Sequence, residues 1–185
     1  MGIGKVKTVF LDRDGVLNRM YVVDGTPHPP DNVAQLEIYP DVTDALRRLK
    51  DAGYLLIVVT NQPDVARGTT TLASVHEINA AFAAYLPIAE FVICPHDDTA
   101  NCPCRKPKPG MLLDAAQRYG VDLAESFMVG DRWRDVDAGA NAGVRTVWID
   151  RGVKERDPDH APDFTTHSLA GAVDWILAVA IPSPV

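Results

Sequence analysis

The chain has 185 residues, which corresponds to roughly one domain. Hydrophobic residues make up 46% and charged residues 23%, an ordinary globular composition that excludes a disordered chain, a collagen-like chain and a Cys-rich secreted scaffold. The net charge of −7 gives the chain no general attraction to nucleic acid, and no apolar run is long enough to predict a membrane span.

Strand and helix patterns alternate along the chain. Short apolar runs rich in β-branched residues predict five strands, at residues 6–11, 55–59, 91–94, 127–129 and 146–149. Amphipathic stretches with helix start and stop signals predict helices at residues 41–50, 72–86, 109–119, 135–142 and 168–180. This alternation predicts one α/β, Rossmann-like domain whose mostly parallel five-stranded sheet carries helices on both faces. We expect the domain to span residues 1–181, residues 182–185 to form a flexible tail, and no cap domain to be present.

The helix predicted over residues 72–86 has an apolar face and an uncertain start. Four side chains share that face and are predicted to be buried: Val75, Ile78, Phe82 and Tyr85. Ser74 and Glu77 have the spacing of a capping box, whereas Thr71 is an alternative first residue.

Polar side chains follow three of the predicted strands at the point where each strand ends. Asp12 and Asp14 follow the first strand, Thr60 ends the second and Asp131 follows the fourth. In an open parallel sheet, ligands bind beyond the carboxyl ends of the strands. Three carboxylates gathered there would repel one another strongly unless a cation bound them, and carboxylate oxygens suit Mg²⁺. The sequence therefore predicts a magnesium site at this edge of the sheet.

The same edge carries groups that can hold a phosphate ester. The Thr60 hydroxyl, the Lys106 ammonium and backbone N–H groups of the turn at residues 12–15 can donate to phosphate oxygens. Gly15 would allow the backbone to approach closely. With one carboxylate as nucleophile and another as proton carrier, this set predicts phosphoryl transfer through an aspartyl-phosphate.

Four segments in chain order resemble the motifs of the haloacid dehalogenase-like phosphatases: LDRDGVLN, VVTNQ, RKPKPGM and VGDRWRDVDAG. The resemblance covers about residues 6–150. It implies that Asp12 is the nucleophile, that Asp14 is the general acid and later the base, and that Thr60 and Lys106 hold the phosphoryl group. It also implies Mg²⁺ ligation by Asp12, the Asp14 backbone carbonyl and Asp131. The implied sheet order, with strands numbered along the chain, is 3-2-1-4-5.

All three cysteines lie within eleven residues of one another and form a pattern with one histidine. Cys94, His96, Cys102 and Cys104 have the composition of a tetrahedral Zn²⁺ site. Four protein ligands leave no open position, so we expect a structural zinc that fixes the loop before Lys106.

The cysteine pattern resembles a zinc-loop subgroup of the same phosphatases. That subgroup includes the D-glycero-D-manno-heptose 1,7-bisphosphate 7-phosphatases and the bacterial histidinol-phosphate phosphatases. The segment CRKPKPGML is more similar to the heptose enzymes, whereas the short loop between His96 and Cys102 is more similar to the histidinol-phosphate group. Pro63 and Asp64 depart from the usual heptose-enzyme pattern. The resemblance thus implies a small-molecule phosphatase, with heptose bisphosphate as the leading substrate and histidinol phosphate as the alternative.

Several further side chains are predicted to contact the substrate. Arg105 matches a position that the family uses for substrate recognition; the alternative is a surface arginine tied to a carbonyl group. The complete set of predicted substrate-binding residues is Met20, Tyr21, Val22, Val23, Asn61, Gln62, Arg67, Arg105 and Arg132.

Two other classes of protein remain open from the residues alone. Clustered aspartates with a threonine and a lysine also occur in phospho-signalling receiver domains, and the cysteine cluster alone would suit a zinc interaction module. An odd number of cysteines and a start without signal-peptide features predict a location in the reducing cytoplasm. We expect a monomer whose partner is a small phosphate ester, with no nucleic-acid or membrane partner.

Overall fold

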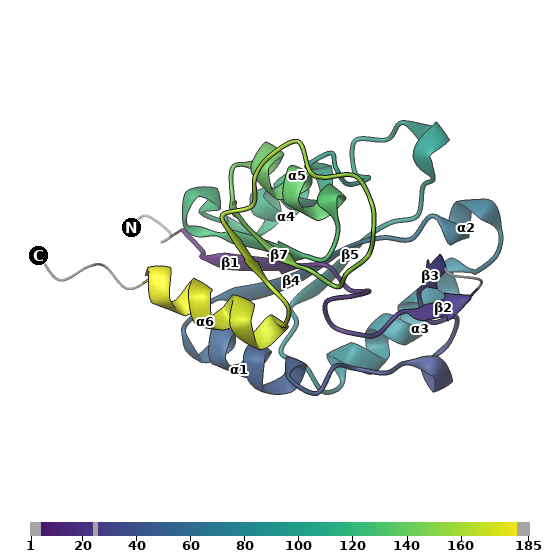
Figure 1. The fold of residues 1–185 in the computed structure, drawn as a ribbon, viewed down its shortest axis with the longest axis horizontal. Helices are drawn as coiled ribbons and strands as arrows, with labels where there is room; N and C mark the ends of the chain where they lie inside the picture. The colour runs from purple at the N-terminus through teal and green to yellow at the C-terminus, as the bar shows by residue number, and fades with distance from the viewer. Residues whose placement is uncertain (1–4, 24–25, 181–185) are drawn as a thin grey trace, which may run out of the picture.

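Six parallel strands form the central sheet, in the order β5-β4-β1-β6-β7-β8 (Figure 1). This is a computed structural model, and it describes residues 5–23 and 26–180. The strands are β1 (Thr8–Leu11), β4 (Leu55–Asn61), β5 (Glu90–Cys94), β6 (Phe127–Gly130), β7 (Arg145–Ile149) and β8 (Phe164–Thr166). The five predicted strands are present in the implied order. The predicted count is wrong by one, because β8 pairs with β7 through only three residues and lacks an apolar run.

Five helices cover the two faces of the sheet (Figure 1). On one face lie α1 (Val42–Asp51), α3 (Leu72–Ala83) and α6 (Leu169–Ala180), and on the other lie α4 (Gly110–Tyr119) and α5 (Trp133–Ala142). A short helix, α2 (Asp64–Arg67), follows β4. The α/β class and the covering of both faces are therefore confirmed.

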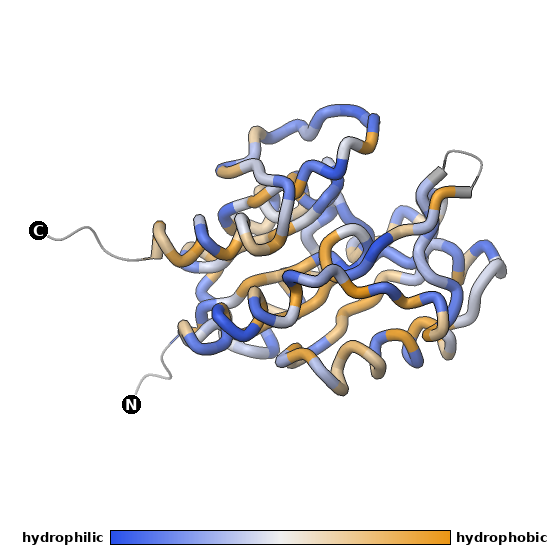
Figure 2. The backbone as a smooth tube through the Cα atoms, turned by 60° about the horizontal axis from the view of Figure 1, so that its bottom comes forward, coloured by the Kyte–Doolittle hydropathy of each residue, from blue (hydrophilic) through white to orange (hydrophobic). Residues whose placement is uncertain are grey.

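The strands are apolar on both sides, which produces two hydrophobic cores. In β1, Val9 and Leu11 face the core under α1 and α6, while Phe10 faces the core under α4 and α5. Successive side chains of a strand point to opposite faces, so a continuous apolar run supplies both cores at once. Figure 2 shows this as hydrophobic colour along the central strands and hydrophilic colour along many of the connecting loops.

A small hairpin follows β1, in a region where no strand was predicted. Strands β2 (Tyr21–Val23) and β3 (Thr26–His28) pair in antiparallel fashion as a separate two-stranded sheet. Strands of three residues are too short to show a periodic pattern, and β3 also contains Pro27. The hairpin lies outside the central sheet (Figure 1).

Helix α3 begins as one of the two alternatives suggested. The Thr71 side chain accepts a hydrogen bond from the Ser74 backbone N–H at 3.1 Å, so Thr71 is the N-cap. The helix ends at Ala83, before Tyr85, whose side chain is 80% exposed. The expected burial of Tyr85 is therefore wrong, because the helical periodicity does not extend that far.

The chain beyond β7 returns to the turn that follows β1. Arg151 donates from Nε to the backbone carbonyl of Gly15 at 2.9 Å, and its guanidinium lies 4.0 Å from the centre of the Tyr39 ring. No helix within the described ranges has the length and apolarity that a bilayer crossing requires. The tail expected at residues 182–185 lies outside the described residues.

Candidate active site

The pairing of β1 with both β4 and β6 gathers three of the expected active-site residues. Asp12 follows β1, Thr60 lies at the end of β4, and Asp131 follows β6. Asp12 Oδ1 accepts hydrogen bonds from the Arg13 backbone N–H at 2.8 Å and from Lys106 Nζ at 2.9 Å. Among the described residues, these are the contacts of the Asp12 carboxylate, and its second oxygen, Oδ2, takes neither of them.

Lys106 is the central cation of this site, and its side chain is only 2% exposed. Its ammonium contacts Asp12 at 2.9 Å and Asp135 at 2.6 Å, and it donates to the Val59 carbonyl at 2.8 Å. Burial alone would lower the Lys106 pKa, but the Asp12 and Asp135 carboxylates more than offset that effect and raise it. Lys106 is therefore a permanent positive charge beside the nucleophile candidate.

The backbone of Lys106 has its own anchor on β4. Asn61 accepts a hydrogen bond from the Lys106 N–H through Oδ1 and donates to the Lys106 carbonyl through Nδ2, each at 3.1 Å. Asn61, predicted to bind substrate, thus fixes the position of Lys106 while it also lines the cavity.

Three buried carboxylates, those of Asp12, Asp131 and Asp135, lie close enough together to share a cation. One oxygen of each lies within 4.8 Å of those of the other two. When all three are ionised, Lys106 as the single ammonium among them leaves the cluster with a net charge of −2. Both oxygens of Asp131 are buried without a hydrogen-bond partner among the described residues. An orphaned buried carboxylate beside a second one fits a divalent metal with oxygen ligands.

Asp135 was not among the predicted site residues. One of its oxygens contacts Lys106, and the other accepts the Arg132 backbone N–H at 3.0 Å. Since both oxygens are engaged, Asp135 holds Lys106 and the start of α5, which leaves Asp12 and Asp131 as the carboxylates free to ligate metal. The spacing from Gly130 and Asp131 to Asp135 in the fourth motif was the signal that could have identified it.

The pKa values of this cluster predict a link between metal binding and pH. Burial and the neighbouring Asp135 raise the Asp12 pKa from 3.8 to about 7, against the lowering effect of Lys106. Burial, Asp12 and Asp135 also raise the Asp131 pKa. A carboxyl group whose pKa rises on folding stabilises the fold below its unfolded pKa, and this stabilisation is lost as the pH rises through the folded value.

We therefore expect Mg²⁺ to raise the melting temperature more at pH 8 than at pH 5, because the metal competes with protons for these carboxylates. Thermal melts with and without Mg²⁺ in chelator-free buffer, with zinc content measured in parallel, check this. An equal Mg²⁺ effect at the two pH values would contradict it.

Gly15 is required for the close approach of the first turn to Asp131. Its φ is +88°, and a Cβ there would lie 2.1 Å from Asp131 Oδ2. We expect Gly15→Ala to displace the Asp131 carboxylate and to lower both Mg²⁺ affinity and kcat/KM by at least about tenfold.

The matched control for this substitution is Gly53→Ala. Gly53 has a similar φ, +86°, but no atom lies within 4 Å of its added Cβ. Both variants should therefore lose about 1 kcal/mol of folding stability, because alanine is strained in the left-handed backbone conformation. Thermal melts measure this loss. If they also lost equal activity, a steric role for Gly15 would be refuted.

Asp14 is held by several side chains that place its carboxylate. Arg13 contacts Asp14 Oδ2 from Nε at 3.1 Å and from Nη2 at 3.0 Å, and Gln62 donates to the same oxygen at 2.8 Å. Asn18 donates to Oδ1 at 3.0 Å. Arg13 is fully buried and donates from Nη1 to Asn79 on α3 at 3.0 Å. The roles of Arg13 and Asn79 were not predicted from the sequence, because their contact spans 66 residues of chain.

A cavity of about 360 Å³ opens above these groups. Most of the predicted site residues line it: Asp12, Asp14, Met20, Thr60, Asn61, Arg67, Arg105, Lys106, Asp131 and Arg132. Gln62 lies beneath the lining, where its amide donates to Thr60 Oγ1 at 2.9 Å as well as to Asp14. Thr60 and Gln62 are both buried.

The segment predicted to cover the substrate differs from expectation. Met20 lines the cavity, but Tyr21 and Val22 do not, and Val22 is 71% exposed. The side chain of Val23 lies outside the described part of the structure. The lining comes instead from the returning side of the hairpin, residues 27–29, because the chain reverses direction at this point.

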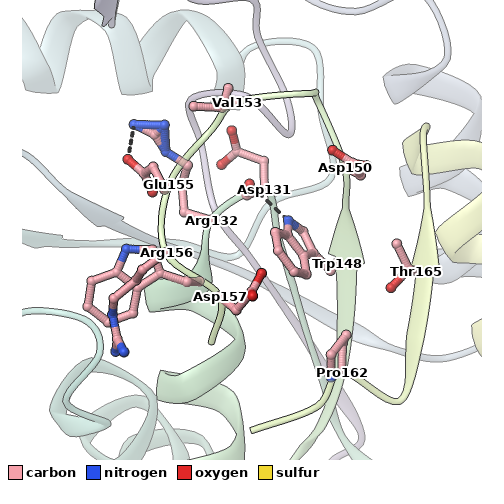
Figure 3. A pocket seen from close by; sticks show the side chains of 11 residues that line it. Asp131, Arg132, Trp148, Asp150, Val153, Glu155, Arg156, Asp157, Pro162 and Thr165 are labelled. Carbon is pink, nitrogen blue, oxygen red and sulfur yellow. Dashed lines mark hydrogen bonds and ion pairs between the residues drawn. The ribbon is translucent and has the colours of Figure 1, made fainter. Parts of the chain in front are cut away.

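A second cavity, of about 330 Å³, lies beside the first and shares Asp131, Arg132 and Glu155 with it (Figure 3). Figure 3 shows the Arg132–Glu155 ion pair, at 3.1 Å, on its rim. The Trp148 indole N–H donates to the backbone carbonyl of Asp131 at 3.1 Å. Trp148 thus supports the strand end that carries Asp131.

The cysteine cluster is brought together as a compact set of four ligands. The Cys104 sulfur lies 3.2 Å from the sulfurs of Cys94 and Cys102 and 3.4 Å from His96 Nδ1. Cys94 Sγ lies 3.6 Å from both Cys102 Sγ and His96 Nδ1. These separations are slightly shorter than the roughly 3.8 Å edge of a tetrahedral thiolate site. The residues fit a closed zinc site between β5 and Lys106.

Comparisons with known proteins agree with this geometry. The HAD-hydrolase-like family model matches residues 103–172. The D-glycero-beta-D-manno-heptose-1,7-bisphosphate 7-phosphatase of Escherichia coli K12 is 37% identical over 179 residues, covering 89% of this chain and 91% of the relative. The corresponding Bordetella bronchiseptica enzyme is 40% identical over 152 residues, covering 80% and 82%.

A solved structure of a D,D-heptose 1,7-bisphosphate phosphatase from B. bronchiseptica, complexed with magnesium and phosphate, has a TM-score of 0.80. It is 31% identical and covers 95% of this chain and 100% of that one. Fold, site and relatives together define a phosphomonoesterase. The chain belongs to the haloacid dehalogenase-like family, and its relatives are named heptose-1,7-bisphosphate 7-phosphatases. This identification decides against a receiver domain and against a purely structural zinc module.

Proposed function

We propose that this chain hydrolyses the 7-phosphate of D-glycero-D-manno-heptose 1,7-bisphosphate through an aspartyl-phosphate on Asp12. The observation that carries the proposal is the cluster of Asp12, Lys106 and Asp131 beneath a cavity that carries basic side chains on its rim. The relatives with this activity share 35–40% of their residues with the chain. The arginines on the rim suit a substrate that carries a second phosphate group.

In the first half-reaction, Asp12 Oδ2 attacks the phosphorus and the sugar oxygen leaves. Lys106 holds Oδ1, which favours the ionised carboxylate and orients it for attack. Asp14 gives its proton to the departing oxygen, so the sugar leaves as an alcohol. Its carboxyl group is fixed for this task by Arg13, Gln62 and Asn18.

In the second half-reaction, Asp14 takes a proton from water, which then attacks the phosphorus. The bond between the phosphorus and Asp12 Oδ2 breaks, and inorganic phosphate and the free carboxylate result. Thr60 donates to the phosphoryl oxygens in both steps, and the Lys106 charge stabilises them electrostatically.

Asp12, the Asp14 backbone carbonyl and Asp131 would hold Mg²⁺, and Cys94, His96, Cys102 and Cys104 would hold Zn²⁺. Bound Mg²⁺ neutralises charge that develops on the phosphoryl oxygens. The orphaned Asp131 oxygens support this assignment. The zinc set leaves no open position, so the proposed zinc is structural.

A panel of kcat/KM values comparing heptose 1,7-bisphosphate with histidinol phosphate tests the substrate. We expect a preference for the heptose bisphosphate of at least about a hundredfold. A preference for histidinol phosphate would overturn the substrate but leave the chemistry unchanged. The short zinc loop and the acidic residues on the cavity rim keep histidinol phosphate, which carries an amine, as the second candidate.

We further propose a monomer located in the cytoplasm, without nucleic-acid or membrane partners. A reducing compartment keeps the three thiols available for zinc, which supports the location. Light scattering at micromolar concentration tests the oligomeric state, and a mass near 20.1 kDa is expected.

A further inference from the structure

Asp98 projects from the zinc loop into the mouth of the active-site cavity. It opens a short 3-10 turn, Asp98–Ala100, between the ligands His96 and Cys102. Its carboxylate contacts two guanidinium groups: Arg105 Nε at 2.9 Å and Nη2 at 3.3 Å, and Arg134 Nη1 at 3.3 Å. All three residues line the cavity.

The charges around the mouth are balanced except at this point. Four arginines and three acids line the rim: Arg67, Arg105, Arg132, Arg134, Asp64, Asp98 and Glu155. Arg67 pairs with Asp64 at 3.3 Å, and Arg132 pairs with Glu155 at 3.1 Å. Only Asp98, among these described acids, is shared between two arginines, so one positive charge is left over beside it.

The arrangement of Arg105 matches the way a guanidinium binds a phosphate. Two of its nitrogens face the two Asp98 oxygens, and the third donates to the His96 carbonyl at 3.1 Å. A phosphate accepts the same parallel pair of hydrogen bonds and carries more charge than a carboxylate. Because Arg105 is held by the zinc loop, its donors stay in place when the carboxylate leaves.

We propose that Asp98 is an internal counter-ion that occupies the site formed by Arg105 and Arg134, and that the second phosphate of the substrate displaces it. This inference rests on the proposed function. The Asp98 side chain is 56% exposed, and among the described residues its carboxylate contacts only these two arginines, so it can move into solvent. A substrate with one phosphate gains nothing from this site, whereas a bisphosphate must first displace the carboxylate. Asp98 thereby sets the affinity of this site for the second phosphate.

Asp98→Asn tests this with heptose 1,7-bisphosphate and heptose 7-phosphate as the paired substrates. We expect the KM for the bisphosphate to fall about threefold to tenfold, since exposed ion pairs are individually weak. The KM for the monophosphate should change less. The measured quantity is therefore the KM ratio, defined as the KM for the bisphosphate divided by the KM for the monophosphate. Asp51→Asn, which removes one exposed charge at the far end of α1, is the control and should leave the ratio unchanged.

A second variant keeps the test independent of the zinc loop. Arg134 lies on α5, and its guanidinium also stacks 4.5 Å from the Trp133 ring centre. Arg134→Ala should raise the KM for the bisphosphate, and it should reduce the gain from Asp98→Asn in the double variant. Zinc content of each variant verifies that the loop is intact.

The outcomes separate this inference from the proposed function. If wild type hydrolyses the bisphosphate but Asp98→Asn leaves the KM ratio unchanged or raises it, the inference alone is overturned. If wild type acts only on histidinol phosphate and Asp98→Asn raises that KM, Asp98 binds the substrate ammonium, and both fail. A fall in the ratio that depends on Arg134 supports the inference.

Discussion

Asp12→Asn should lower kcat by at least about a thousandfold, because an amide oxygen cannot replace the carboxylate that attacks phosphorus. Asparagine has nearly the same shape as aspartate, and Lys106 keeps its contact with Asp135 at 2.6 Å. The fold should therefore persist while turnover is lost. Steady-state release of phosphate with Mg²⁺ present measures the effect.

A stability measurement distinguishes lost chemistry from lost folding in this variant. Burial and Asp135 raise the Asp12 pKa to about 7, so the ionised side chain is costly in the metal-free fold at pH 8. Asp12→Asn removes that cost, and the metal-free variant should melt at or above the temperature of wild type at this pH. Asp44→Asn, which removes an exposed partner of Arg47, serves as the control and should keep full activity. Near-normal turnover by Asp12→Asn would refute the nucleophile assignment.

Cys104→Ser should release zinc and lower the melting temperature by roughly 5–10 °C. Cys104 contacts each of the other three ligands, so its loss breaks the set at its centre. The stability loss should be large because the loop carries little hydrophobic core of its own. Elemental analysis and thermal melts measure both quantities.

The kinetic effect of zinc loss should fall on KM more than on kcat. The Lys106 backbone is held independently by Asn61, at 3.1 Å in both directions. Arg105, in contrast, is held by the His96 carbonyl, which belongs to the zinc loop. Thr99→Ala, a change in the same loop that removes no ligand, should retain zinc and KM. If Cys104→Ser lost kcat without a change in KM, the zinc loop would be positioning Lys106 instead.

The sequence predicted those features of the fold that depend on residues close together in the chain. Strands such as β4 show their burial on both faces through continuous β-branched residues, and Asp12, Thr60 and Asp131 follow because strand ends converge in any parallel sheet. The zinc ligands are close in sequence, so their spacing was visible directly.

What the sequence could not predict depends on contacts between distant segments. The buried side chain of Arg13 donates a hydrogen bond to Asn79, which lies 66 residues away in the chain. Nothing in an Asp-Arg-Asp turn indicates that the arginine side chain points into the protein. The strand β8 exists because β7 offers an open edge to a polar three-residue segment. Tyr85 lay in phase with the buried face of α3, but the helix ends before it.

The bond between Arg151 and the Gly15 carbonyl bears on what a minimal version of this enzyme would need. The four motifs end by Asp150, which invites truncation of the chain at that point. Yet Arg151 donates to the turn that carries Asp12 and Asp14, and it also donates to the His167 carbonyl beyond β8. The chain that follows β7 therefore stabilises the nucleophile turn through Arg151, and an engineered protein that keeps every motif but ends after β7 would lose this hydrogen bond to the turn.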